Sequence, residues 1–229
     1  MGKLIEARFA SLKPRDATDE QELEVEVARM PPLEVGIRNQ WEPNDELKND
    51  KIEHCLQIVK WNLIDIADRL SMSQADVARY AVHFGIRRLF HLPGITEIRE
   101  IRSFVLHNSE DPEHRRWFDS GSFDLGTSST VTLRTRLFEK DQAQCAGLAS
   151  IVGLAPPLIR QLAMMAVLIE SRELPVEHNN EMVAILKGFR EWIEGRVEKA
   201  RWIKERVEEE AAKRPKKVGA RRTWEEVVG

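Results

Sequence analysis

A single alternating stretch, TVTLRTRL at residues 130–137, stands in a chain whose other strong patterns are helical. Successive side chains of a strand point to opposite faces, so this stretch has one largely apolar face and one polar face with two arginines. A lone strand would leave its backbone N–H and C=O groups without partners, and it therefore requires a second strand. The apolar face contains Val131, Leu133, Thr135 and Leu137, and the polar face contains Thr132, Arg134 and Arg136.

Two sources of that second strand agree with the sequence. The first is the same strand of another chain, because a two-fold axis brings identical strands together at a shared centre. The second is LEVGIRN at residues 33–39, in a region whose alternation on both sides of Pro31 and Pro32 predicts a hairpin or an edge strand. We predict the homodimer as the simpler arrangement, with pairing inside one chain as the alternative.

Helical spacing predicts a first pair of helices before the alternating stretch. Apolar residues recur every three or four positions from Asp45 to about Leu70, and this stripe includes Ile52. Ser73 is a favourable N-cap for the next helix, ADVARYAVHFGIRRLF, which ends before Pro93. The following TEIREIRSFVLH fits a helix or a strand, and NSEDPEHRRWFDSGSFDLGTSS indicates a loop.

A second pair of helices, EKDQAQCAGLASIV and PPLIRQLAMMAVLIES, follows the alternating stretch. The two pairs resemble a diverged internal repeat, because superimposing Ala67 on Ala149 brings further apolar residues into register. A charged helix with near-heptad apolar spacing then extends from about His178 to Lys213. The aligned positions of the repeat are Leu70 with Val152, Met72 with Leu154, Val77 with Ile159 and Ala81 with Ala163.

The composition indicates a folded protein with segregated charge. Of its 229 residues 42% are hydrophobic, enough for a buried core, and the net charge is −3. Residues 1–50 hold 7 Lys/Arg against 12 Asp/Glu, and the remaining residues hold 28 against 26. Two isolated cysteines exclude a disulfide scaffold or a zinc knuckle and favour a reducing compartment. Because the sequence has no signal peptide or membrane-spanning run, we expect a cytoplasmic protein without membrane contact.

The second unit resembles the ribbon-helix-helix family, the Arc and methionine repressor class of DNA-binding proteins. The resemblance covers residues 130–171, from the strand TVTLRTRL through the helix FEKDQAQCAGLASIV and the turn GLAPP to a second helix. It implies that two strands pair antiparallel and enter the major groove of DNA. It also implies that Thr132, Arg134 and Arg136 read bases, since arginine donates two hydrogen bonds to guanine and threonine contacts a thymine methyl group. The alternative is a solvated strand face, or one paired with the acidic N-terminal region.

The resemblance further implies a phosphate site at the start of each second helix, where backbone amides carry partial positive charge. Pro156 and Pro157 remove two such amides from the second unit. In the first unit, LIDIADRLSMSQADVARYAV also resembles a helix-turn-helix. We therefore predict phosphate contacts from Ser73, Gln74 and Arg79, with an ordinary helical hairpin as the alternative.

The segment KRPKKVGARR is strongly basic and is interrupted by Pro215 and Gly219. We expect it to contact phosphates irrespective of base sequence, with a solubilising role as the alternative. Its basic residues are Lys213, Arg214, Lys216, Lys217, Arg221 and Arg222.

The sequence offers little support for catalysis. HNSEDPEHRRW concentrates histidine and acidic residues, but their spacing matches no metal site, and we interpret the segment as a polar loop. The sequence also lacks a phosphate-binding glycine loop and a nucleophile elbow. We predict a protein that is not an enzyme, with no catalytic residues, metal or cofactor.

These patterns predict a mainly α fold with a short β ribbon, ribbon-helix-helix-like units and a long C-terminal helix. The predicted function is sequence-specific binding of double-stranded DNA, as a transcriptional repressor or an accessory protein in plasmid or phage DNA maintenance. The alternative is an assembly subunit that uses the fold only for dimerisation and binds a protein through its acidic N-terminal region or long helix. The predicted segments are an acidic segment (1–45), a helical pair (46–92), a linker or insertion (93–129), a ribbon-helix-helix-like unit (130–175), a long helix (176–213) and a basic tail (214–229).

Overall fold

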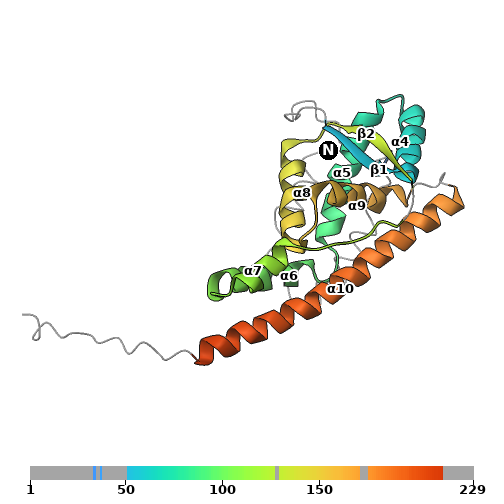
Figure 1. Ribbon diagram of the computed structural model, residues 1–229. Coiled ribbons are helices and arrows are strands. Elements are labelled where there is room, and N and C mark those ends of the chain that lie inside the picture. Colours follow the sequence, from blue (N-terminus) through green and yellow to red (C-terminus); the bar gives the residue numbers. More distant parts are fainter. Residues whose placement is uncertain (1–32, 35–36, 38–50, 127–128, 171–174, 214–229) are drawn as a thin grey trace, which may run out of the picture.

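The computed structural model describes residues 33–34, 37, 51–126, 129–170 and 175–213. This part of the chain is mainly helical, with one two-stranded antiparallel ribbon and a long C-terminal helix, which confirms the predicted fold class. Figure 1 shows the ribbon beside α4, α5, α8 and α9, and α10 crossing below them with α6 and α7 along its C-terminal half. The elements are β1 (Lys51–Leu56), α4 (Gln57–Leu70), α5 (Gln74–Phe90), α6 (Ile95–Asn108), α7 (Pro112–Asp119), β2 (Thr130–Thr135), α8 (Glu139–Val152), α9 (Pro156–Leu168) and α10 (Val176–Lys213).

The partner of the alternating strand is β1 of the same chain, which confirms the alternative of pairing inside one chain but with a different strand from the expected LEVGIRN. The antiparallel register pairs Lys51 with Thr135 and Leu56 with Thr130. The prediction of a helix through Ile52 was therefore wrong, because a strand that runs directly into a helix has its last apolar residues in phase with the helical stripe.

The prediction that residues 33–39 form the partner strand is also wrong. Its described residues Leu33, Glu34 and Ile37 are helical, and Leu33 and Ile37 are buried in the core. Glu34 forms an ion pair with Arg69 at 2.6 Å, which attaches this segment to α4. The rest of the predicted N-terminal hairpin lies outside the described residues. The ribbon of the chain is thus complete without a second molecule.

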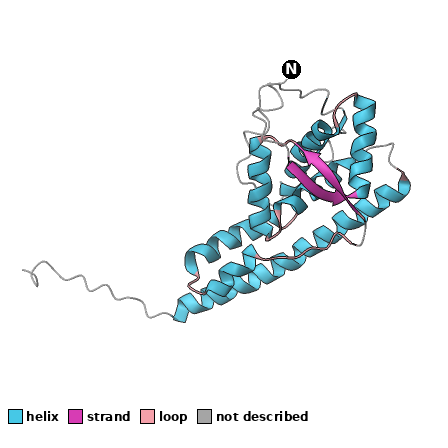
Figure 2. Ribbon diagram, turned by 45° about the horizontal axis from the view of Figure 1, so that its top comes forward, coloured by secondary structure: helices cyan, strands magenta, loops and turns pink. Residues whose placement is uncertain are grey.

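The alternation of TVTLRTRL is confirmed by burial. Leu133, Thr135 and Leu137 are buried, and Val131 packs partly buried against the core. Figure 2 shows the ribbon lying across the helices, so that one of its faces meets the helical layer and the other faces outward. The strand therefore has the two chemically different faces that its sequence predicts.

The predicted internal repeat is present as two strand-helix-helix units. The first residues of α4 and α8, Gln57 and Glu139, are 82 residues apart, and the same spacing separates the starts of α5 and α9. The turns between the helices also match, since Ser71 (φ 53°) and Gly153 (φ 75°) are both left-handed. The two units are therefore related by an offset of 82 residues and meet through their strands and through α5 and α9.

The second helices of the two units, α5 and α9, form the centre of the core. They are buried on nearly all sides, and they approach each other most closely at Gly85, where an added Cβ would lie only 1.8 Å from the carbonyl oxygen of Ala163. Only glycine permits the two backbones to approach so closely.

For TEIREIRSFVLH the helical alternative is confirmed, whereas the loop predicted for the following residues is wrong over 112–119. The two segments form α6 and α7, and Asp111 caps α7 by accepting a hydrogen bond from the amide of Glu113 at 2.8 Å. The polar composition of this segment hid a helix whose exposed face is charged and whose Phe118 is fully buried.

The long helix α10 packs along α6, as its near-heptad apolar spacing predicts. Its Arg201 donates hydrogen bonds to Glu97 of α6, which raises the pKa of Arg201. Its buried face includes Phe189, Ile193, Ala200, Ile203 and Val207.

Arg196 joins α10 to the end of α7. Its guanidinium lies 4.1 Å from the ring centroid of Trp117, and Nη2 donates a hydrogen bond to the Trp117 carbonyl at 3.0 Å. Burial lowers the pKa of Arg196 to about 10, because desolvation disfavours the charged form. The positive charge also suits the C-terminal carbonyls of α7, which form the negative end of the helix dipole.

Candidate nucleic-acid interface

The outer face of the ribbon carries all three predicted base-reading residues. Thr132, Arg134 and Arg136 are exposed, whereas the intervening Leu133 and Thr135 are buried. Thr132 and Arg134 are alternate positions of β2, about 6.6 Å apart, and Arg136 continues their alternation directly after the strand ends at Thr135. The structure therefore brings together on one surface the residues that the resemblance selects.

Strand β1 adds His54, which the sequence analysis missed. His54 is exposed and pairs with Thr132 in the register. Directly opposite residues of an antiparallel pair project to the same face, with Cβ atoms about 4.5–5.5 Å apart. We call Thr132, Arg134, Arg136 and His54 the outer ribbon face. Subtracting the repeat offset of 82 residues from the alternating stretch 130–137 gives residues 48–55, which would have predicted a strand that includes His54.

Lys60, in the first turns of α4, lies at the edge of the outer ribbon face. Its Nζ donates a hydrogen bond to the carbonyl oxygen of Thr132 at 2.8 Å. An amphipathic helix gives no sign from its sequence that such a lysine will meet a strand. The contact places an ammonium group beside Thr132, the cross-strand partner of His54, where it increases the positive potential of the ribbon.

The free edge of β1 is closed by Gln161 of α9. Its Oε1 accepts a hydrogen bond from the amide of Leu56 at 3.1 Å, and its Nε2 donates to the carbonyl of His54 at 2.9 Å. The side chain thus takes the place of a third strand and satisfies backbone groups that an edge would leave unpaired. This pairing fixes the backbone that carries His54.

The start of α5 has the predicted cap, but Arg79 is not available for the predicted phosphate contact. Ser73 is exposed and accepts a hydrogen bond from the amide of Asp76, while Gln74 is half-buried. Burial disfavours the predicted phosphate contact of Arg79, whose side chain pairs with Asp76 at 3.0 Å and lies 5.0 Å from the ring centroid of Phe138. The Asp76 carboxylate also counters the positive end of the helix dipole.

The other predicted phosphate contacts are distributed unevenly. Pro156 and Pro157 occupy the first positions of α9, so this helix start lacks two amides. Lys213 is the exposed last residue of α10, and Figures 1 and 2 place that end of the helix away from the ribbon. The remaining basic tail residues, Arg214, Lys216, Lys217, Arg221 and Arg222, lie outside the described residues.

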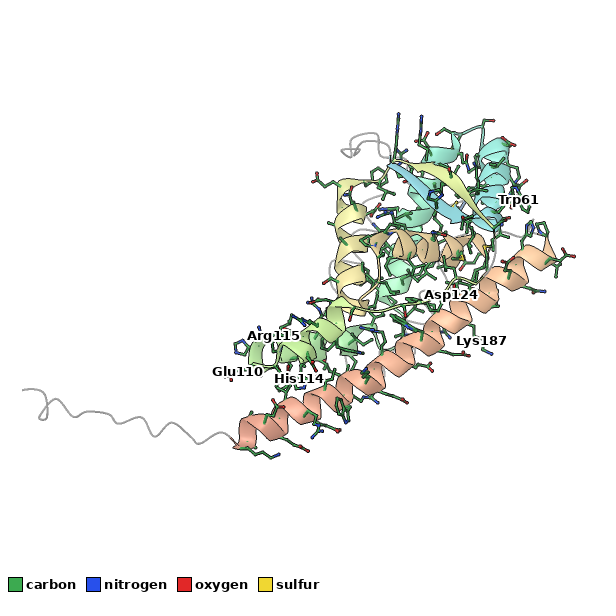
Figure 3. The ribbon with its side chains drawn as sticks, in the orientation of Figure 1. Trp61, Glu110, His114, Arg115, Asp124 and Lys187 are labelled. Carbon is green, nitrogen blue, oxygen red and sulfur yellow. The ribbon has the colours of Figure 1, made fainter. Side chains whose placement is uncertain are left out.

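The polar residues around the start of α7 form hydrogen bonds with one another. Figure 3 shows Glu110, His114 and Arg115 at the end of α7, far from the ribbon. His114 Nδ1 and the Ser109 hydroxyl lie 3.0 Å apart, and Arg115 Nε donates to the Ser109 carbonyl at 3.0 Å. Among the described residues no group of three or more His, Cys, Asp and Glu side chains is arranged to hold a metal. These contacts stabilise the turn between α6 and α7.

Within the described ranges no individual helix has both the length and the apolar composition of a membrane span, and the pair α8 and α9 has them only jointly, with a 107° bend. Comparison with protein-family models, curated proteins and solved structures found no significant match.

Proposed function

We propose that the chain binds double-stranded DNA through the outer ribbon face, as a ribbon-helix-helix protein whose two units are joined in one chain. The observation that carries the proposal is the exposed row of Thr132, Arg134 and Arg136 on a ribbon whose other face is buried. The major groove of DNA, about 12 Å wide, admits a two-stranded ribbon of this kind. His54 on β1 extends the row to the second strand.

Binding would combine phosphate attraction with base reading. Lys60 and the basic tail would draw the ribbon towards the duplex, and the amide of Gln74 at the start of α5 would face a phosphate. Arg134 and Arg136 would then donate to the O6 and N7 atoms of guanine, and Thr132 would contact a thymine methyl group. Occupancy alone would suffice for a cytoplasmic repressor or an accessory protein in plasmid or phage DNA maintenance.

Truncation of the arginines tests the ribbon directly. We expect Arg134→Ala or Arg136→Ala to cost about 1–3 kcal/mol of binding free energy at a selected site and to relax specificity there. The fold should be retained, because both side chains are exposed. Fluorescence anisotropy titration with selected and scrambled duplexes measures both effects.

Lys187→Ala is the matched control for the removal of positive charge. Lys187 is exposed on α10 and lies away from the ribbon in Figure 3. Its removal should leave the affinity for the selected site within a factor of about two, because salt screens the effect of exposed charges outside the contact surface. Unchanged binding by the Arg134→Ala, Arg136→Ala double variant would exclude the ribbon from DNA recognition.

Deletion of residues 213–229 tests the tail. We expect weaker binding to all duplexes alike and a shallower dependence of log K on log salt, by about 0.9 for each phosphate that the tail neutralises in the intact chain. Preference between selected and scrambled sites should barely change. A full-length variant with its six tail lysines and arginines replaced by glutamine separates charge from length, and a salt slope equal to that of the intact chain would contradict the tail's role.

An assembly subunit is the second candidate, favoured by the starts of α5 and α9. Pro156 and Pro157 remove amides from one start, and Asp76 places a carboxylate at the other, so neither resembles a strong phosphate site. In this case the units would serve only to pack against another protein. Duplex binding that is undetectable at both 50 mM and 200 mM salt would favour this candidate over DNA recognition.

A further inference from the structure

We infer that the DNA site of this chain is asymmetric: one chain reads one non-palindromic sequence, with arginine over one side and His54 with Thr132 over the other. The inference rests on the proposed function and adds the class of sequence that is bound. Its basis is that the two strands of the ribbon come from different parts of one chain. Each outward side chain therefore occurs once, whereas a homodimeric ribbon presents each of them twice.

The register locates the centre of the ribbon. Ile52 and Arg134 are 82 residues apart, the offset of the internal repeat, and they are also partners in the antiparallel pairing. Equivalent positions that pair with each other must lie on the pseudo-two-fold axis relating the two units. Arg134 thus occupies the middle of the outer ribbon face.

The two sides of this centre carry different chemistry. By the same offset Arg136 occupies the position of His54, and the two residues lie on opposite sides of Arg134 along the ribbon. A guanidinium always carries its charge and presents a fork of donors, whereas imidazole presents one donor and one acceptor when neutral. Arg136 therefore favours a guanine on its side of the centre, and His54 imposes no such preference for guanine on the other side.

The flanking groups also differ between the two sides. Lys60, which contacts the Thr132 carbonyl on the His54 side of the centre, corresponds to the uncharged Gln142 in the second unit. The start of α5, with Ser73 and Gln74, corresponds to Ala155 and Pro156 at the start of α9, so the Gln74 amide has no counterpart there, although Asp76 weakens the positive potential at the α5 start. The charged and polar groups therefore differ between the two sides of the centre, and a single orientation on the duplex is favoured.

Selection of duplexes from a random library with the intact chain tests this inference. We expect a non-palindromic consensus and, by light scattering of the purified complex, one chain per duplex. Arg136→Ala should then weaken binding about 5- to 150-fold and relax base preference on one side of the consensus centre, and His54→Ala should relax it on the other side. Lys187→Ala should leave both sides unchanged, and circular dichroism verifies that each variant is folded.

Three other outcomes would overturn different parts of the inference. A palindromic consensus occupied by two chains, with each substitution relaxing both halves equally, would overturn the asymmetric site and leave DNA binding intact. Relaxation of the same side by Arg136→Ala and His54→Ala would overturn the placement of the centre at Arg134. A library with no enrichment, together with no duplex binding at low salt, would overturn the proposed function and the inference with it.

Discussion

Leu133→Asp is expected to abolish folding of the chain. Leu133 is 1% exposed on the inner face of β2, so the substitution forces a carboxylate into the layer between the ribbon and the helices. Burial of an unpaired charge costs many kcal/mol or forces a large shift of its pKa, against a total stability of about 5–15 kcal/mol for a typical domain. Loss of the cooperative transition in thermal unfolding followed by circular dichroism measures the effect.

Thr132→Asp is the neighbouring control. Thr132 is exposed on the outer ribbon face, so the same carboxylate remains solvated and the fold should persist. Binding to DNA should fall nonetheless, because the charge would face the phosphates and the base edges. A Leu133→Asp variant as stable as the native chain would mean that the ribbon does not pack on the helices as described.

Gly85→Ala is expected to cost about 3 kcal/mol or more of unfolding free energy, at the upper end of overpacking effects. The new Cβ would lie 1.8 Å from the backbone oxygen of Ala163, and a backbone atom cannot move aside as a flexible side chain does. The helices α5 and α9 would have to separate, and the close packing of the surrounding core would loosen. Urea unfolding at equilibrium measures the difference.

Gly147→Ala makes the comparison specific. Gly147 is exposed in α8, and a Cβ added there meets no atom within 4 Å. This variant should gain about 0.5–1 kcal/mol, because alanine loses less backbone entropy in a helix than glycine. Equal effects of the two substitutions would show that Gly85 does not set the distance between α5 and α9.

Patterns with a clear period predicted much of the fold. The alternation of TVTLRTRL correctly separated buried Leu133 from exposed Arg134, and helical spacing correctly indicated α5, α8, α9 and α10. The alignment of Ala67 with Ala149 identified the offset that relates the two units. These features depend on which face of an element meets the core, and burial of that face leaves a direct trace in the order of residues.

Features that depend on contacts between distant segments were not predictable in the same way. In β1, Lys51 and Glu53 stand where the repeat has Leu133 and Thr135, so the strand lacks an apolar alternation of its own. It forms because β2 supplies hydrogen-bonding partners, which no local pattern records.

One side chain was predicted wrongly and another was missed for a related reason. Arg79 has the spacing of an exposed helical position, but Asp76 and the ring of Phe138 provide a buried environment for its guanidinium. Gln161 gave no sign of its role because its donor and acceptor partners both lie on β1. Tertiary partners decided both positions.

The closure of β1 by Gln161 also has a consequence during protein synthesis. Gln161 lies 105 residues after Leu56 in the chain, and its amide contacts the β1 backbone only once α9 has been made. At a translation rate of about 5–20 residues per second, β1 emerges about 5–20 s before this partner does. Throughout that interval the strand has an unpaired edge, and the first unit has no α9 against which to bury α5. The nascent first half is therefore the stage at which a chaperone or a neighbouring chain has the longest access to this protein.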